Sequence, residues 1–379
     1  MKVLHICNDF AGSKVHASLV RELDLLGVEQ VVYCPVRDKR LLERNQFESH
    51  RVQFVYSYVI RPWYKFFYFH KRNRLYADLK SKVDLSKIDL VHASTLFSDG
   101  GIAYLAQKEF GIPFVSAVRA VDLIDFVGMR PYLLHWGRKY LLAAQKLYFI
   151  SPWAIKMFRQ MAWIQSVKTH IENKIQLQCN GIDTFWFQHV SRMPHEGKNI
   201  LYVGSFESRK NVPTLINAVS YLRENGFPDL QLTVVGGGKD ENHTQQSIER
   251  HSSFVHFLGR IDDKNELVRL FQQHALFAMV SWNETFGLVY LEALSQNLPV
   301  VYVQGQGIDG LFDEEHNPVG VAANPRSVKS IADAISQILC NPGRYSNQQV
   351  NFEDFEWKNI AVRYLQCYQA IENSLNVKK

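Results

Sequence analysis

A chain of 379 residues, of which 46% are hydrophobic and 21% charged, is too long for one typical domain and holds enough apolar side chains for two cores. The five cysteines are odd in number and form no CxxC pair, which argues against a disulfide framework or a zinc site and favours a reducing compartment. The first residues lead straight into a strand-like run and no uncharged apolar run is long enough to cross a bilayer, so we expect a cytoplasmic chain without a signal peptide.

The net charge of +6 is divided unevenly. Residues 1–184 hold 26 Lys and Arg against 16 Asp and Glu, whereas the remaining residues hold 17 against 21. A basic first half and a mildly acidic second half indicate two domains with different partners.

In the first half, short β-branched runs alternate with longer helical patterns. In chain order the predicted strands are KVLHIC, EQVVYC, DLVHAS, IPFVSAV and KLYFIS. The segment VHASLVRELDLLG has apolar residues at helical spacing and a closing glycine, so it is predicted as a helix. This alternation is typical of a parallel sheet with crossover helices.

The same alternation starts again in the second half. The strands NILYVGS, LQLTVVGGG, FVHFLG, LFAMVS and PVVYV alternate with VPTLINAVSYLRENG and other helical patterns. The weakest periodicity falls at residues 187–198 (FQHVSRMPHEGK), where we expect the two domains to join. The sequence therefore predicts an α/β protein with two doubly wound, Rossmann-like domains.

Glycines follow several predicted strands, at the place where doubly wound folds bind ligands. They occur in DFAGS, at Gly204, at Gly236–Gly238 and at Gly259. None belongs to a GxGxxG dinucleotide fingerprint with an acidic residue at the required distance. Each glycine alone is more often a tight turn than a ligand contact, but their common position at strand ends favours a ligand site.

Two glutamates stand out in the stretch ETFGLVYLEAL. In one continuous helix Glu284 and Glu292 would lie roughly 80° apart and share no face. Because LFAMVS is predicted as a buried strand, Glu284 is expected in the loop after it, with Thr285 capping a helix that starts near Phe286. Gly287 would let a diphosphate approach that helix start, and Glu292, about 9 Å further along the axis, would reach a ribose. The two carboxylates would then hold two ends of one ligand.

The spacing Glu284-x7-Glu292 resembles the EX7E signature of retaining GT-B glycosyltransferases, specifically those of family 4. GSFESRKNVPTLINAV resembles that family's phosphate-binding strand–loop–helix, and CNGIDTFWF resembles its linker segment. FVHFLGRI, LPVVYVQGQGIDGLF and FEWKNIAVRYLQCY follow in the family's order. In the first half, GSKVH and DLVHASTLFSDGGIAYLAQKEFGIP resemble acceptor-domain elements, so the resemblance covers nearly the whole chain.

This resemblance implies a GT-B fold in which residues 1–185 form an acceptor-binding domain and residues 186–355 a nucleotide-sugar-binding domain. Residues 356–379 would form a helix that crosses back to the first domain. The implied activity is retaining hexosyl transfer from a UDP- or GDP-sugar to a saccharide or lipid-linked acceptor, in polysaccharide, lipopolysaccharide or glycolipid synthesis. The resemblance implies neither a cofactor nor a metal ion.

The resemblance also assigns site residues. Arg209 and Lys210 would neutralise the diphosphate and Glu284 would position the transferred sugar, so these three are the expected catalytic residues. Glu292 would bind the ribose. The further expected donor-binding residues are Gly204, Ser205, Gly236, Arg260, Phe286, Gly287 and Leu288, and those expected on the acceptor side are Gly12, His16, Arg119 and Asp122.

Two positions depart from the family's pattern. Ser205 stands where many members carry an arginine, and Arg209 would supply the missing charge. Arg119 lies where many relatives have a histidine before the aspartate, and it cannot act as a general base at neutral pH. An ion pair of Arg119 with Asp122 or Asp125 is an equally supported structural interpretation.

Two other functions fit the same architecture. A nucleotide-sugar epimerase of the GT-B type would need an acid/base set and no acceptor surface. A non-catalytic nucleotide-sugar-binding protein is compatible with the two departures, but not readily with the retention of both glutamates and the Arg209–Lys210 pair. A retaining glycosidase pair explains neither that basic pair nor the two βα arrays.

An aromatic and basic stretch in the first half predicts a membrane surface. Between Ser49 and Ala77 there is no acidic residue, and basic side chains alternate with rings there: Arg51, Arg61, Trp63, Tyr64, Lys65, Phe66, Phe67, Tyr68, Phe69, Lys71, Arg72 and Arg74. A second such cluster is MRPYLLHWGRKYLL. Rings with a basic rim suit an anionic membrane, so we expect a peripheral protein at the inner face of the cell membrane. No RNA-binding motif appears, so we expect no nucleic-acid partner.

Overall fold

The computed structural model describes residues 1–193, 198–238, 241–316, 318–348 and 350–376. The chain divides into two compact units. Unit 1 comprises Met1–Ile150, Ala154–Gly181 and Trp357–Lys379, and unit 2 comprises Ser151–Trp153 and Ile182–Glu356. The join expected at residues 187–198 falls within the range of unit 2, and its residues 194–197 lie outside the described residues.

The described strands of unit 1 form one parallel sheet in the order β3-β2-β1-β4-β5-β6-β7. These strands are β1 (Lys2–Ile6), β2 (Glu29–Val36), β3 (Val52–Tyr58), β4 (Leu90–Ala93), β5 (Phe114–Ala117), β6 (Lys146–Phe149) and β7 (Ile175–Leu177). Every residue of β4 and β5 is buried, because helices cover both faces of a parallel sheet.

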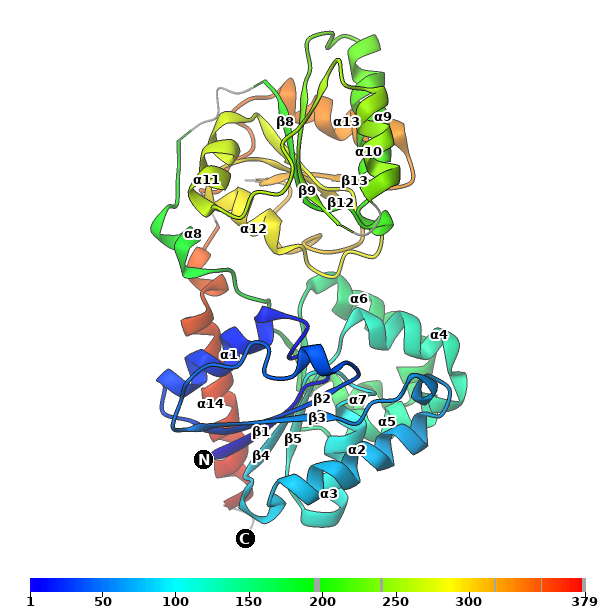
Figure 1. The fold of residues 1–379 in the computed structure, drawn as a ribbon, viewed down its shortest axis with the longest axis vertical. Coiled ribbons are helices and arrows are strands. Elements are labelled where there is room, and N and C mark those ends of the chain that lie inside the picture. The colour runs from blue at the N-terminus through cyan, green and yellow to red at the C-terminus, as the bar shows by residue number, and fades with distance from the viewer. Residues whose placement is uncertain (194–197, 239–240, 317, 349, 377–379) are drawn as a thin grey trace. The chain divides into compact units, whose positions relative to one another are not determined.

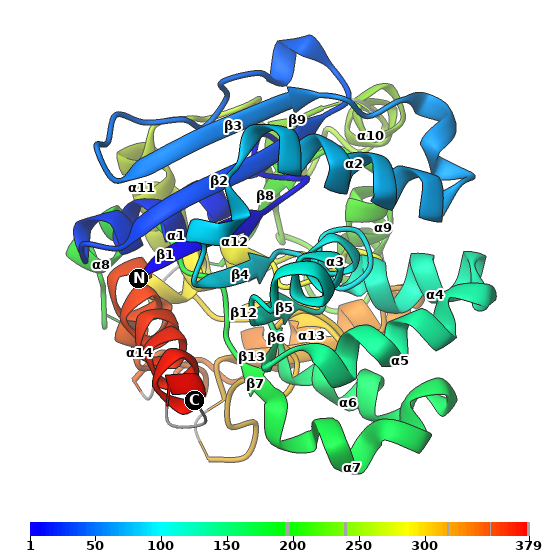
Figure 2. The same ribbon diagram turned by 90° about the horizontal axis from the view of Figure 1, so that it is seen from below.

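The helices of unit 1 pack on the two faces of its sheet. They are α1 (Lys14–Leu25), α2 (Tyr68–Lys82), α3 (Gly100–Phe110), α4 (Val127–Met129), α5 (Leu134–Ala143), α7 (Lys168–Ile171) and α14 (Trp357–Asn376), and α6 (Pro152–Gln160) begins in unit 2 and ends in unit 1. On one face, α1 and α14 lie side by side over Val3, Leu90 and Val115 (Figure 2). On the other face, α3 packs between α2 and α5.

Unit 2 repeats the design with the strand order β10-β9-β8-β11-β12-β13, again parallel. Its described strands are β8 (Ile200–Ser205), β9 (Leu232–Gly237), β10 (Val255–Phe257), β11 (Leu276–Ala278), β12 (Val300–Val303) and β13 (Gly320–Ala323). The order reverses direction between β8 and β11, and in open α/β sheets such a switch point is where ligands bind.

The helices of unit 2 also form two layers. As Figure 1 shows, α9 (Val212–Glu224), α10 (Glu241–Arg250) and α13 (Val328–Leu339) cover one face of the sheet. The other face carries α8 (Thr184–Gln188), α11 (Lys264–Gln273) and α12 (Leu288–Ser295). Two doubly wound α/β units confirm the fold class predicted from the sequence.

Some local expectations differ from the structure. The strands β3, β7 and β13 were not predicted, and α12 starts at Leu288 instead of near Phe286. The expected cap by Thr285 is wrong, because Gly287 is the residue before the helix, with φ +80°, and no side chain caps it. In the described part of the chain, no helix combines the length and the apolar character required to cross a bilayer.

Candidate functional site

The ends of β8 and β9 form a glycine-lined floor in unit 2. Gly204 pairs with Gly236 in the sheet register, and Ser205 pairs with Gly237. Gly236 has φ +146°, and a Cβ atom there would lie 1.8 Å from the carbonyl oxygen of Gly204. Only glycine fits at position 236, so the backbone lies bare at the carboxyl edge of the sheet, where a ligand can approach it.

The basic pair follows β8 on a short 3-10 turn, Ser208–Lys210. Asn211 ends this turn with φ 59°, and its amide donates to the carbonyl oxygens of Val280 (3.1 Å) and Pro325 (2.8 Å). The turn is therefore fixed to the loops after β11 and β13. The two basic residues precede α9, which starts at Val212, the first residue of the helix predicted from the sequence.

The two basic side chains have different partners. Lys210 Nζ lies 2.7 Å from Glu284 Oε2, and the side chains are only 12% and 5% exposed. Arg209 Nε lies 2.6 Å from Glu207 Oε2, and both of these side chains are about half exposed. Because exposed ion pairs contribute little, Arg209 is free to exchange Glu207 for another anion, whereas the Lys210–Glu284 pair is a fixed element of the site.

Glu284 is held from several sides. Its backbone N–H donates to Gln306 Oε1 (2.8 Å), and its carbonyl oxygen accepts from the N–H of Gly307 (3.1 Å). The N–H of Thr285 donates to Glu284 Oε1 at 3.2 Å. The loop after β12 thus fixes the loop after β11, and the carboxylate keeps one orientation.

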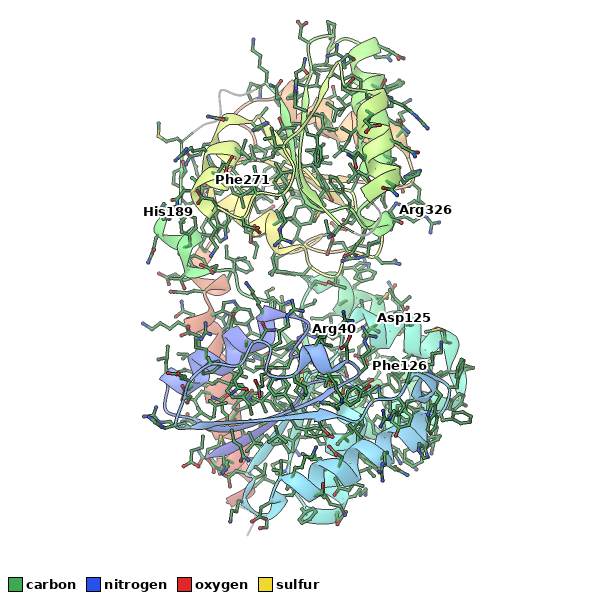
Figure 3. All side chains as sticks on the ribbon, in the orientation of Figure 1. Arg40, Asp125, Phe126, His189, Phe271 and Arg326 are labelled. Carbon is green, nitrogen blue, oxygen red and sulfur yellow. The ribbon has the colours of Figure 1, made fainter. Side chains whose placement is uncertain are left out.

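Glu292, on α12, lies in a different environment. Its carboxylate accepts a hydrogen bond from the buried indole of Trp186 on α8. Burial raises the pKa of Glu292 to about 7, although Lys264 and the Trp186 hydrogen bond oppose this effect. Trp186 packs against Phe271 of α11, labelled in Figure 3, with ring centroids 5.7 Å apart. The carboxyl group of Glu292 is therefore about half protonated near neutral pH.

The remaining predicted donor residues differ in their exposure and in their location within unit 2. Gly287 and Leu288 lie at the start of α12, but the side chain of Phe286 is buried, so only its backbone is available to a ligand. Arg260 follows β10, is exposed and pairs with Asp262 at 2.9 Å. No contact joins Arg260 to Lys210 or Glu284 among the described residues.

In unit 1, two of the predicted acceptor residues line one small pocket. His16 and Arg119 share it with His5, Ser94 and Asn180, and its empty volume is about 440 Å³, counting the solvent-open mouth. Burial, followed by Arg119 and His5, lowers the pKa of His16 to about 3, so this imidazole is neutral at neutral pH.

The other two predicted acceptor residues lie outside the lining of that pocket. Asp122 is fully buried and accepts from the backbone N–H groups of Leu96 (3.1 Å), Phe97 (3.0 Å) and Arg119 (2.9 Å). Asp122 thus ties together the loops after β4 and β5. Its contact with Arg119 is a backbone hydrogen bond, and the guanidinium of Arg119 instead donates to the carbonyl oxygen of Ser94 at 3.4 Å. Gly12 is exposed, and a Cβ atom there would meet Asp9 Oδ1 at 2.2 Å.

Two residues that the sequence analysis missed belong to the site in unit 2. Gln306 orients the backbone of Glu284, and Trp186 binds Glu292. Both lie in segments quoted for their family resemblance, CNGIDTFWF and LPVVYVQGQGIDGLF, but no spacing rule connects them to the glutamates. Within the described ranges, no three His, Cys, Asp or Glu side chains gather as a metal site would need.

Models of two protein families match the chain. The model described as "Glycosyltransferase Family 4" matches residues 12–184, and the model described as "Glycosyl transferases group 1" matches residues 186–353. Together they cover nearly all of both units, and both describe glycosyltransferases.

Curated relatives match over about half of the chain. Glycogen synthase of Mycobacterium tuberculosis is 31% identical over 201 residues, which are 50% of this chain and 47% of the relative. Phosphatidyl-myo-inositol mannosyltransferase of the same organism is 25% identical over 205 residues, which are 52% of this chain and 54% of the relative. The chain thus spans about half the length of the curated relatives it matches.

Among solved structures, sucrose-phosphate synthase from Thermosynechococcus elongatus superimposes with a TM-score of 0.75. The alignment covers 99% of this chain and 100% of that one at 19% identity. A likeness at this identity shows a common fold, and that fold spans the whole chain.

Proposed function

Because the chain belongs to glycosyltransferase family 4, with the GT-B fold, we propose that it transfers a hexosyl group from a UDP- or GDP-sugar to a saccharide or lipid-linked acceptor. The observation that carries the proposal is the buried Lys210–Glu284 ion pair, held at 2.7 Å on loops that follow two strands of one parallel sheet. A fixed ammonium group stabilises a leaving diphosphate, and a fixed carboxylate binds sugar hydroxyls.

In the proposed reaction, the bond between the anomeric carbon of the sugar and the phosphate oxygen breaks. An acceptor hydroxyl oxygen bonds to the same face of that carbon, its proton passes to the departing phosphate oxygen, and the anomeric configuration is retained. Lys210 and Arg209 neutralise the diphosphate that leaves with the bonding electrons, which is the main electrostatic task when no metal ion takes part. Glu284 positions the sugar and supports its developing positive charge.

The proposal assigns the other donor contacts to unit 2. Glu292 accepts from the ribose hydroxyls, and Trp186 orients it. Gly204, Ser205 and Gly236 present backbone to the diphosphate at the carboxyl edge of β8 and β9. Arg209 supplies the charge that Ser205 lacks, because its pairing with Glu207 is exposed and readily exchanged.

The proposal includes a membrane setting. Exposed rings at Trp63, Phe66 and Phe67 lie among basic side chains in unit 1, an arrangement that suits the surface of an anionic bilayer. We place the protein as a peripheral protein at the cytoplasmic face of the cell membrane, acting in polysaccharide, lipopolysaccharide or glycolipid assembly.

The donor site is tested by thermal shift with UDP, GDP, ADP and CMP on the wild type and on Glu292→Ala. A nucleotide that binds only the folded state raises the melting temperature, by about 2.7 kcal/mol of stabilisation at a hundredfold excess over Kd. We expect one nucleotide to give a shift that Glu292→Ala abolishes. The exposed glutamate Glu266 on α11 is the matched control, and Glu266→Ala should keep the shift.

Two results would contradict the proposal. A wild type that no nucleotide stabilises has no donor site of the proposed kind. A wild type that binds a nucleotide-sugar but releases no nucleotide when an acceptor extract is added is not a transferase.

A further inference from the structure

A basic pocket in unit 1 lies apart from the pocket of His16 and Arg119. It opens between the 3-10 turn Pro62–Lys65, the helix α2, the loop before α3 and the helical segment that ends at Arg130. Its empty volume is about 350 Å³, counting the part open to solvent. We call it the basic pocket, and its charged lining is Lys65, Lys71, Arg72 and Arg130.

The charged side chains that line the basic pocket are all cationic among the described residues. Among the described residues, none of the four forms an ion pair with Asp or Glu, and no acidic residue lines the pocket. Asp99 acts on Lys71 electrostatically, but it is fully buried and is bound to the hydroxyl of Thr95 at 3.0 Å. Burial lowers the pKa of Lys71, Asp99 opposes this effect, and Arg130 and Arg37 lower the pKa further.

Arg72 shows how far the imbalance goes. The residue is 8% exposed, and its guanidinium donates only to neutral oxygens, those of Tyr140 (3.0 Å) and Asn73 (2.9 and 3.1 Å). The rings of Phe69 and Trp136 lie within 5.3 Å of its Cζ atom. A buried cation without an anion beside it lowers the stability of the fold. An anion bound next to Arg72 and the three other cations would offset that loss.

Exposed apolar side chains adjoin, along the chain, the residues that line the basic pocket. Phe66 is 67% exposed and Phe67 59% exposed after the first turn, and Met129 is 66% exposed beside Arg130. Phe126, labelled in Figure 3, contributes to the lining from the helical segment Asp122–Phe126. Rings and a thioether around four cations match a bilayer surface in which an anionic head group is held at the centre.

We propose that the basic pocket binds the phosphate or diphosphate group of the acceptor, and that the acceptor is a lipid whose chains lie in the bilayer beneath the exposed rings. The identification of this ligand as the acceptor rests on the proposed transfer reaction. The binding of an anion in the basic pocket does not depend on that reaction. Lys65 and Lys71 contact the phosphate oxygens as point charges, and Arg130 does so as a fork. A terminal phosphate, which carries more charge than a phosphodiester, is the preferred ligand.

The test uses sedimentation of the full chain with two kinds of vesicle at matched surface potential. Phosphatidylcholine vesicles containing phosphatidate carry a terminal phosphate, and those containing phosphatidylglycerol carry only a phosphodiester. We expect the wild type to prefer phosphatidate, and Lys71→Gln to lower binding to phosphatidate about tenfold with little change on phosphatidylglycerol. Lys65→Gln, at an exposed position that tolerates substitution, should act in the same direction.

The matched control is Arg74→Gln on the same helix. Arg74 is exposed and does not line the basic pocket, so its loss changes general attraction to both vesicles equally and keeps the preference. Inorganic pyrophosphate should compete with phosphatidate vesicles for the wild type. If pyrophosphate binds through Lys71 but the vesicles show no preference, the lipid part of the proposal is wrong. If neither Lys71→Gln nor Lys65→Gln changes the preference, or the wild type shows no preference and pyrophosphate does not bind through Lys71, the whole proposal is wrong.

The outcome is separable from that of the proposed function. Lys71→Gln should leave the nucleotide-induced thermal shift of unit 2 unchanged, because all donor residues lie in unit 2. If the wild type binds phosphatidate through Lys71 but binds no nucleotide, the proposal of an anion site in unit 1 stands and the proposed transferase function is wrong.

Discussion

At the scale of single residues, the centre of the candidate site is the Lys210 ammonium group, which in the proposed reaction would be shared between Glu284 and a diphosphate. Lys210 Nζ already contacts Glu284 Oε2 at 2.7 Å, so a bound diphosphate must share that charge with a buried carboxylate. Under the proposed function, the carboxylate would oppose diphosphate binding and support the positive charge that develops on the sugar, so binding and transfer would make opposite demands on Glu284.

Replacing Glu284 with Gln separates these two demands. We expect nucleoside diphosphate binding to tighten roughly tenfold, because like-charge repulsion at short range is removed, and transfer to fall by more than about a hundredfold. Calorimetry and a product assay measure the two effects. Glu207→Gln is the control, because Glu207 pairs with Arg209 at an exposed position, and its effect on binding should stay within about threefold. Weaker nucleotide binding by a folded Glu284→Gln protein would contradict this account.

The raised pKa of Glu292 predicts how the stability of the protein depends on pH. Its carboxyl pKa is raised from the ordinary 4.5 to about 7, so the folded state holds a proton that the unfolded state loses. Wild-type stability therefore falls as pH rises from about 4.5 to about 7, and the loss is complete above that range. Glu292→Gln should raise the free energy of unfolding at pH 8 by up to about 3 kcal/mol, and the gain should vanish near pH 4.5. Urea unfolding at both pH values measures it, and an equal gain at both would show that ionisation is not the cause.

At the scale of elements, the loops after β8, β9, β11 and β12 form one interlocked rim. Gly236 is the tightest point, because its backbone meets that of Gly204 across the register of β8 and β9. At that point the rim can be formed only by a residue without a side chain, which explains the glycines at the carboxyl edge of β8 and β9.

Gly236→Ala tests this tight contact. The added Cβ atom would lie 1.8 Å from a carbonyl oxygen, so we expect a loss of more than about 3 kcal/mol in unfolding free energy and a loss of nucleotide binding. Gly226→Ala is the matched control, since Gly226 also has positive φ but has no atom within 4 Å of the added Cβ. The control should cost only about 1 to 2 kcal/mol and keep the binding. Equal effects in denaturant titrations would refute the contact argument.

The same scale shows what the sequence could predict. Strands such as β1, β4 and β8 contain adjacent buried apolar residues and were found, whereas β3 alternates and lies beside an aromatic and basic stretch, β7 has three residues and β13 reads GVAA. The roles of Lys210 and Glu284 were assigned from their resemblance to family motifs, and these roles remain predictions. Their direct contact, and that of Glu292 with Trp186, joins residues far apart in the chain, which no local pattern reveals.

At the scale of the whole molecule, unit 1 depends on a helix encoded after unit 2. In unit 1, α14 buries Ile360, Tyr364 and Tyr368 against the sheet, and the hydroxyl of Tyr368 lies 2.6 Å from His92 Nδ1. Each such large side chain contributes about 1.5 to 3 kcal/mol when buried, so the helix as a whole contributes as much as a typical domain's net stability.

Removing residues 357–379 should therefore unfold unit 1 and spare unit 2. In a calorimetric scan we expect one of two transitions to disappear, and the remaining transition to rise in temperature when the nucleotide identified by thermal shift is added. The full chain, scanned under the same conditions, is the reference. Loss of the nucleotide-responsive transition on truncation would show that unit 2 cannot stand alone.

The position of α14 in the sequence also sets the order in which the chain matures on the ribosome. Unit 1 begins synthesis first, yet the strands β1, β4 and β5 wait for their cover until unit 2 and then α14 have been made. At about 5 to 20 residues per second that delay lasts roughly 10 to 40 s, during which the part of the sheet face that α14 covers is open to other nascent chains. Unit 2 completes its own core in that interval. We therefore expect a chaperone that acts on nascent chains to bind the first half of this protein in preference to the second.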